Sequence, residues 1–219
     1  ADLDVREATR TAALARSAHP TLRAFWQAGV TLQTGQPVAA PPFTALKSPA
    51  VDLTIAAALV TDDLDAMEAR IREARRRQAD LIVFPARAVA ETLLPRLQAA
   101  ARASAITVVF GAEHRDGSRT WNSAFVVAPD GRLQTRYDQL SATPPYEPGN
   151  KAAVMWFRVK GVPAVVTIGG DGLWSELAEL SALAGAQVHV HLEHGPASGP
   201  AAMLRRQVWA NLASYQTFT

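Results

Sequence analysis

The residues best suited to chemistry lie near the end of the chain, where His189, His191, Glu193 and His194 follow one another closely. His189 and His191 are two apart in an apolar segment that we predict to be a strand, so both side chains should point to one face. Imidazole and carboxylate groups can bind zinc, which would activate a water molecule for hydrolysis. The alternative is that one histidine faces the core and the others line an exposed rim. We favour the alternative and therefore expect no cofactor, with zinc as the second interpretation.

The chain contains no cysteine, which excludes disulfides, thiolate metal sites and a thiol nucleophile. Ser141 and Ser175 are the serines that could replace a thiol. Each would need a neighbouring base, and no histidine lies near either of them in the sequence. A serine hydrolase is therefore not the interpretation that the residues favour.

Short apolar segments alternate with helical ones, and a Pro-Asp-Gly turn at 129–131 predicts a hairpin. This order is typical of a layered α/β domain with a mixed sheet. The segment 106–110 should end at Gly111, and Asp62-Asp63 should begin the helix at 62–77. The strands that we predict are 51–60, 81–84, 106–110, 123–127, 131–137, 153–158, 162–168 and 188–192. The helices that we predict are 1–24, 62–77, 95–103, 175–183 and 204–214.

The composition indicates a globular chain of 219 residues with 48% hydrophobic and 19% charged residues. A net charge of +2 and the lack of a long basic stripe argue against nucleic acid as a partner. The arginine-rich face of the predicted helix 62–77 is typical of a solvated surface. No apolar run approaches the about 20 residues of a membrane helix. We expect a cytoplasmic protein without membrane contact, with an extracytoplasmic domain of a larger protein as the alternative.

Six short motifs follow one another in a fixed order along the chain. They are 79–85, Phe110-Gly111, 121–124 with 129–131, Tyr137-Asp138 with 146–149, 168–176 and Gly185-Ala186. In this order they resemble the motifs of the nitrilase, or carbon–nitrogen hydrolase, superfamily, and the resemblance covers roughly 51–219. Any one motif is weak, but their common order is strong evidence of shared ancestry.

The resemblance implies the family's four-layer α-β-β-α sandwich, here incomplete at the C-terminus. Residues 1–50 would form an N-terminal extension, a helix followed by a proline-rich loop, and 51–219 the nitrilase-like domain. Relatives continue past the position of Thr219 with strands that complete the second sheet. An open sheet edge favours association, so we expect a homo-oligomer or a partner chain that completes the sheet.

The family's chemistry uses a cysteine nucleophile, a glutamate general base and a lysine that stabilises the oxyanion. In this sequence the resemblance places these positions at Gly169, Ala86 and Gln139. An arginine often found on the helix after the cysteine corresponds to Glu179. Glu91 lies five residues after Ala86 and could turn toward the site, although a role at a helix start is the simpler interpretation. The thiol mechanism is therefore lost, and we expect no enzyme of that kind.

Three other residues are candidates for the pocket: Glu147, Asp171 and Trp174. Glu147 resembles a second glutamate that orients the site in active relatives, although loop anchoring near Pro148-Gly149 is the interpretation that we prefer. The first functional hypothesis is a pseudoenzyme that binds a small amide, nitrile or carboxylate, or that regulates a partner. The second is a C–N hydrolase with a changed, metal-assisted mechanism. The third is a domain related to the N-acyltransferase branch, suggested by Tyr137-Asp138 and the proline-rich loop at 141–151.

Overall fold

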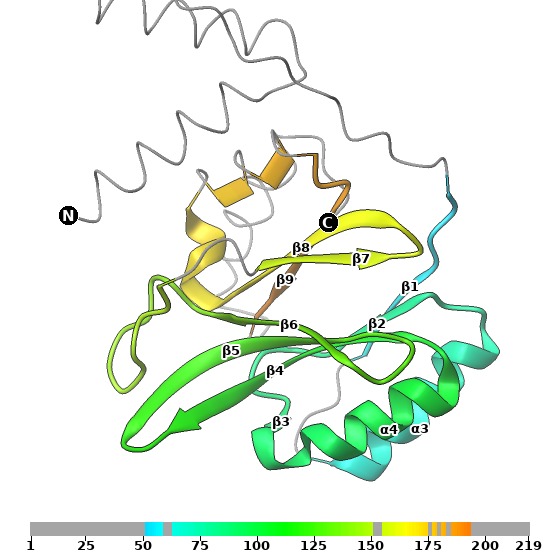
Figure 1. Ribbon diagram of the computed structural model, residues 1–219, viewed down its shortest axis with the longest axis horizontal. Helices are drawn as coiled ribbons and strands as arrows, with labels where there is room; N and C mark the ends of the chain where they lie inside the picture. The colour runs from blue at the N-terminus through cyan, green and yellow to red at the C-terminus, as the bar shows by residue number, and fades with distance from the viewer. Residues whose placement is uncertain are drawn as a thin grey trace, which may run out of the picture.

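The computed structural model describes residues 51–58, 63–150, 155–174, 177–178, 181–182 and 185–193. These residues form two sheets that lie face to face, with two helices on the far side of the larger sheet (Figure 1). The predictions for the N-terminal extension 1–50 and for the helix 204–214 lie outside the described residues. The helix predicted at 175–183 is described only at four positions, all helical.

The larger sheet is mixed, as the sequence predicts. Its strand order is β1-β2-β4-β5-β6, and β3 also pairs with β4. β1, β2 and β4 are parallel, whereas β4, β5 and β6 are joined as antiparallel hairpins. The strands are β1 (Ile55–Ala57), β2 (Leu81–Val83), β3 (Val89–Ala90), β4 (Thr107–Asp116), β5 (Arg119–Val127) and β6 (Leu133–Asp138).

The smaller sheet has the order β7-β8-β9. β7 (Trp156–Val159) is antiparallel to β8 (Val162–Ile168), and β8 is parallel to β9 (Val188–Leu192). Every residue of β8 is buried. A continuous apolar strand such as β8 is typical of a position covered on both faces.

The helices and the two apolar cores define the layers. α3 (Leu64–Arg76) and α4 (Leu94–Ser104) pack on the larger sheet over one core, where the Phe110 and Phe125 rings stack with centroids 5.4 Å apart. A second core lies between the sheets, and it includes Val109 and Val166. The helical residues 177–178 and 181–182 lie beyond the smaller sheet, where the Ser181 hydroxyl is 3.5 Å from Nδ1 of His189. The described layers thus follow the α-β-β-α order.

α3 illustrates how the sequence determines an element. The Asp63 side chain accepts a hydrogen bond of 3.1 Å from the N–H of Ala66 and caps the helix. The apolar positions face the sheet, and the last turn carries arginines that favour the negative end of the helix dipole. The prediction for this helix is confirmed; its buried residues are Leu64, Met67, Ile71 and Ala74.

The expectation that the third strand ends at Gly111 is wrong, because β4 continues to Asp116. A Cβ at Gly111 would lie 2.5 Å from Cα of Ala86, so the glycine permits a close backbone approach inside the strand. The next strand also begins earlier than predicted, at Arg119. β4 and β5 together form a long hairpin whose end extends past the helices (Figure 1).

Candidate functional site

A hollow of about 200 Å³ brings Ala86, Gln139 and Gly169 together. Ala86 follows β2, Gln139 follows β6, and Gly169 opens the short 3-10 helix η3 (Gly169–Leu173) after β8. The site therefore lies where strands of both sheets end. Its lining residues are Ala86, Arg87, Asn122, Gln139, Thr143, Tyr146, Gly169 and Glu193.

Backbone hydrogen bonds fix Ala86 in the wall of the hollow. Its N–H donates to the carbonyl of Glu193 at 3.1 Å, and the N–H of Gly111 donates to the carbonyl of Pro85 at 3.1 Å. The residue is 2% exposed. A methyl group in this place can neither accept nor donate a proton.

Gly169 has a positive φ of +59°, and the Gln139 carboxamide lies directly beside it. A Cβ at position 169 would be 2.6 Å from Oε1 of Gln139, closer than a real contact allows. The backbone conformation itself disfavours other residues by about 1–2 kcal/mol. The side chain of Gln139 therefore takes up the space that any side chain at 169 would need.

Gln139 and Asn122 form a buried pair of amides. Asn122 Nδ2 donates to Gln139 Oε1 at 2.7 Å, and Gln139 Nε2 donates to the Ser141 hydroxyl at 3.5 Å. Asn122 is 7% exposed, and its Oδ1 is the one buried side-chain polar atom without a hydrogen-bond partner in the part of the chain that the structure describes. An unmatched buried acceptor costs about 1–3 kcal/mol. The Ser141 hydroxyl contacts an amide here and has no imidazole bonded to it among the described residues.

Asp171 holds the segment that carries Gln139. Its carboxylate is fully buried and accepts hydrogen bonds from the Tyr137 hydroxyl at 2.6 Å and from the N–H groups of Leu140 and Ser141, both at 2.7 Å. Burial, together with the Asp171 charge, raises the pKa of Tyr137 far above its usual value. Asp171 thus lies behind the hollow and positions its wall.

The other two pocket candidates, Glu147 and Trp174, are also not among the lining residues. Glu147 is exposed, and its backbone N–H donates to the carbonyl of Thr120 at 2.8 Å. Trp174 is partly buried and directly follows η3. The structure brings Tyr146 to the hollow instead, where its hydroxyl donates to Oε1 of Glu113 at 2.6 Å.

The family assignment follows from a comparison with protein-family models. The model described as carbon-nitrogen hydrolase matches residues 50–215, which is more than half of the chain. The chain belongs to the carbon–nitrogen hydrolase family. No curated protein sequence matches it significantly.

Solved structures agree with this carbon–nitrogen hydrolase assignment. An amidase from Nesterenkonia sp. superimposes with a TM-score of 0.65 at 16% identity, covering 75% of this chain and 73% of that one. A cysteine-to-alanine variant of the Nesterenkonia AN1 amidase, from the nitrilase superfamily, gives 0.66 at 16% identity, with coverage of 79% and 76%. A cysteine-to-alanine variant in complex with butyramide gives 0.62 at 18% identity, with coverage of 73% for both chains. At these identities the likeness establishes the nitrilase-superfamily fold.

The histidines of this carbon–nitrogen hydrolase family member lie on the smaller sheet. Nε2 of His189 and Nδ1 of His191 each lie 2.9 Å from the Thr167 hydroxyl, so the two side chains share a face as predicted. Nε2 of His191 lies 3.4 Å from Oε1 of Glu193. Among the described residues, no group of three or more histidine, cysteine, aspartate or glutamate side chains is placed to hold a metal ion. His194 lies outside the described residues, as do Glu179 and Ser175.

His189 is buried, with 2% exposure. Burial, with a smaller contribution from neighbouring His191, lowers its pKa from 6.5 to about 3. The imidazole is therefore neutral at neutral pH. It is buried on the face of β9 opposite the core between the sheets, near the Ser181 hydroxyl.

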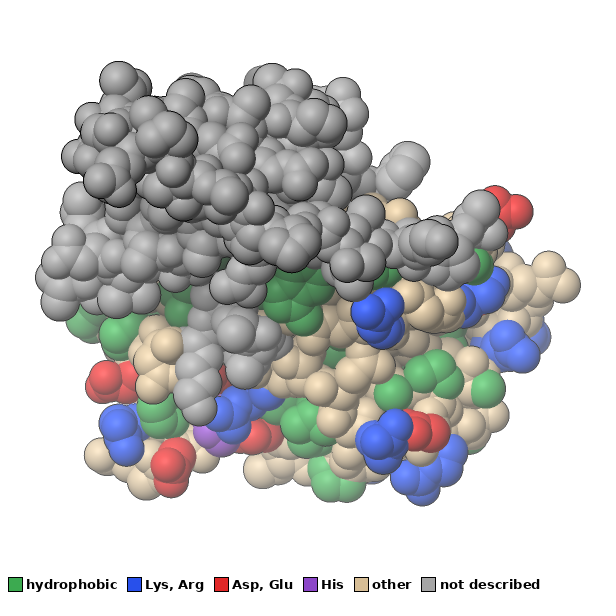
Figure 2. Space-filling model, turned by 45° about the horizontal axis from the view of Figure 1, so that its top comes forward, with side chains coloured by type: hydrophobic (Ala, Val, Ile, Leu, Met, Phe, Trp, Pro, Cys, Tyr) green, Lys and Arg blue, Asp and Glu red, His purple; other side chains and the backbone are tan. Residues whose placement is uncertain are grey.

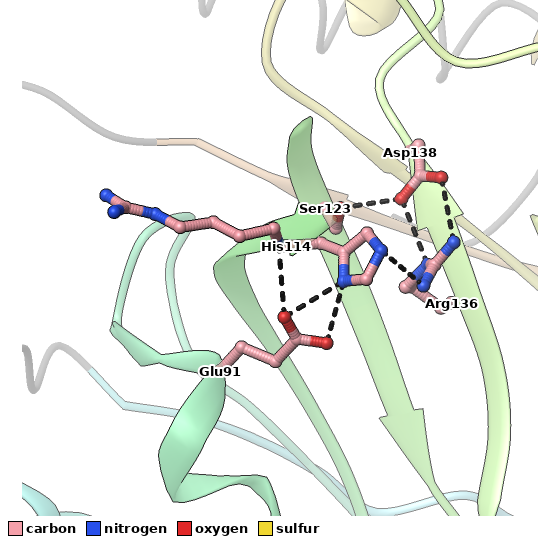
Figure 3. Close-up of polar contacts among 6 residues, drawn as sticks. Glu91, His114, Ser123, Arg136 and Asp138 are labelled. Atoms are coloured by element: carbon pink, nitrogen blue, oxygen red, sulfur yellow. Dashed lines mark hydrogen bonds and ion pairs between the residues drawn. The ribbon is translucent and has the colours of Figure 1, made fainter. Parts of the chain in front are cut away.

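A second polar cluster lies on the opposite face of β4, β5 and β6 (Figure 3). Nδ1 of His114 lies 2.8 and 2.9 Å from the two carboxylate oxygens of Glu91, and Nε2 lies 2.8 Å from Nη1 of Arg136. Because a guanidinium only donates, Nε2 must accept and Nδ1 must carry the proton given to Glu91. Asp138 pairs with Arg136 and accepts from the Ser123 hydroxyl at 2.6 Å. Glu91 is thus engaged away from Ala86.

The surface of the described chain carries mixed charge. On the face shown in Figure 2, acidic and basic side chains are interspersed with apolar ones, in keeping with the small net charge. Among the described residues, no helix is both long enough and apolar enough to cross a membrane.

Proposed function

We propose that this carbon–nitrogen hydrolase family member binds a small polar molecule and does not hydrolyse it. The observation that carries the proposal is the convergence of Ala86, Gln139 and Gly169 on one hollow. The family's pocket position is retained, but none of its three chemical groups is present.

The missing groups have predictable effects on rate. A general base contributes about 10²–10⁴-fold, and an oxyanion donor about 10²–10³-fold. Such contributions are not additive, because the groups act as a unit. Without a nucleophile at Gly169 there is no atom to form the covalent intermediate. The glutamine amide at 139 can donate a neutral hydrogen bond only.

The hollow is suited to a molecule of a few heavy atoms. Its about 200 Å³ is smaller than the roughly 300–1,000 Å³ of pockets for drug-sized ligands. Amide, hydroxyl and charged groups line it, including Asn122, Thr143 and Arg87. The similar cysteine-to-alanine variant in complex with butyramide supports the view that a site of this fold can hold an amide after a cysteine is removed.

Calorimetric titration of the full chain with butyramide tests the proposal. We expect saturable binding in the millimolar range, since so small a ligand makes few contacts. Thr143→Trp should block the hollow, because Thr143 lies in its wall and is exposed. Thr92→Trp is the matched control, since Thr92 is exposed on η1 (Glu91–Leu93) outside the hollow. Absence of binding, or binding that Thr143→Trp leaves unchanged, would contradict the proposal.

A further inference from the structure

We propose that Asn122 is the ligand-recognition residue of this hollow and that the Gln139 carboxamide occupies the ligand's place until a ligand displaces it. The inference rests on the proposed function and extends it to a named contact and a ligand class. The class is a small carbonyl compound that carries an N–H group.

Asn122 is built into the site with one acceptor unmatched. It lines the hollow, is 7% exposed, and its Oδ1 has no hydrogen-bond partner among the described residues. The other end of the same amide, Nδ2, donates to Gln139 Oε1 at 2.7 Å. Since buried polar atoms are nearly always paired, the free oxygen calls for a donor beyond the described residues, and a ligand in the hollow would supply one.

Gln139 is placed as a replaceable partner. Its carboxamide lies against Gly169, in the space that a side chain at that position would take. One short bond, from Asn122, holds Oε1, whereas Nε2 reaches Ser141 at 3.5 Å, which is long for a hydrogen bond. The end of a glutamine side chain can rotate without movement of the backbone.

A ligand carboxamide would complete the hydrogen bonding of Asn122. Its carbonyl oxygen would accept from Nδ2 in place of Gln139 Oε1, and its N–H would donate to the free Oδ1. A carboxylate would instead place a negative oxygen against Oδ1, and an ester has no N–H to donate. Asn122 therefore selects for the N–H group and not for the carbonyl alone.

Gln139→Ala in the full chain tests the displacement. Removing the competing carboxamide should tighten butyramide binding by about tenfold, the factor that corresponds to roughly one hydrogen bond. Gln187→Ala is the matched control, because Gln187 is exposed and outside the hollow, and it should not change the affinity. A thermal melt checks folding, and Gln139→Ser serves as a second variant with the same expected direction.

Asn122→Leu in the Gln139→Ala background should abolish the gain. In that background butyrate and methyl butyrate should bind at least about tenfold more weakly than butyramide, since each lacks the N–H group. Equal or weaker binding after Gln139→Ala, or butyrate that binds as well as butyramide, overturns the inference. One outcome is that the parent chain binds butyramide and Thr143→Trp blocks that binding, while Gln139→Ala leaves the affinity unchanged. In that case the proposed function stands and only the displacement of Gln139 is overturned. If neither the parent chain nor any variant binds butyramide, both the proposed function and this inference fail.

Discussion

The two faces of the β4–β5–β6 edge carry polar clusters of different character. On the inner face, toward the smaller sheet, Asn122 and Gln139 form a neutral amide pair. On the outer face, their chain neighbours Ser123 and Asp138 join a charged network with Arg136 (Figure 3). Successive strand residues point to opposite faces, so the same two strands supply both clusters.

The two clusters differ in the charge of their members. The outer network keeps two carboxylates and a guanidinium, all paired and partly exposed to water. The inner site combines the methyl group of Ala86 with the neutral carboxamide of Gln139. The charged residues that line the hollow are Arg87 and Glu193. Three hydrogen bonds to the Asp171 carboxylate support the wall of the inner site.

The largest expected effect is that of Asp171→Ala. It would leave the buried Tyr137 hydroxyl and the part-buried N–H groups of Leu140 and Ser141 without an acceptor. This should lower the free energy of unfolding by about 3–5 kcal/mol. Asp138→Ala, on the partly exposed outer face, should lower it by about 1 kcal/mol. Urea unfolding of both variants measures the two losses of unfolding free energy. Equal losses would contradict the prediction that the inner site depends more strongly on its carboxylate than the outer cluster does.

The buried His189 should make the stability of the fold depend on pH, whereas the half-buried His114 of the outer cluster should not be the source of this dependence. The pKa of His189 is about 3 in the folded chain and 6.5 as the ordinary value, so the unfolded chain takes up the proton first as the pH falls. The contribution of His189 to the free energy of unfolding is therefore fully present above about pH 6.5 and is lost progressively toward pH 3. At pH 5 the loss should be about 2 kcal/mol.

Urea unfolding at pH 7 and pH 5 checks the effect of His189. His189→Gln should remove this part of the pH dependence, whereas His114→Gln, on the outer cluster, should retain it. An unaltered slope in His189→Gln would exclude the buried imidazole as its source.

A smaller effect distinguishes two glycines with the same backbone conformation. Gly169 and Gly117 have φ of +59° and +60°, but a Cβ at Gly117 would meet nothing within 4 Å. Gly117→Ala should therefore cost only the backbone term of about 1–2 kcal/mol. Gly169→Ala should cost about 0.5–1.5 kcal/mol more, because Gln139 must give up its bond to Asn122.

The extra cost at Gly169 should disappear in the Gln139→Ala background. A double-mutant cycle on unfolding free energies measures this coupling. Strict additivity would mean that the Gln139 carboxamide does not occupy the space beside Gly169.

The smallest effect should come from Glu91→Gln on the outer face. The carboxylate is partly exposed, so its loss should cost about 0.5–1 kcal/mol. Butyramide titration of this variant should match that of the parent chain. A changed affinity would show that the outer cluster and the hollow are coupled, so that the outer cluster is not purely structural.

Much of the fold could be predicted because local signals and the tertiary structure agree. The cap at Asp63 and the apolar spacing of α3 identified that helix, and the order of short motifs identified the family. The motif order also gave the three positions Ala86, Gln139 and Gly169 that the structure brings to one hollow.

The contacts within the site could not be predicted, because they depend on register. A bulge between Val126 and Val127 shifts the β5–β6 pairing by one residue. Counting outward from the turn would have paired Asn122 with Asp138, whereas the structure places Asn122 beside Gln139. The outer cluster was missed for a related reason, since Glu91 and His114 are 23 residues apart and meet only when η1 packs against β4.

A chain that holds the family's pocket without its chemistry should bind butyramide and leave it intact. The most direct test is to measure ammonia release from saturating butyramide on the unaltered chain, in the same sample in which binding is recorded. We expect binding with no ammonia above the buffer rate. Ammonia release that Thr143→Trp abolishes and Thr92→Trp leaves intact would contradict it, since turnover would then occur in a hollow without nucleophile, base or lysine.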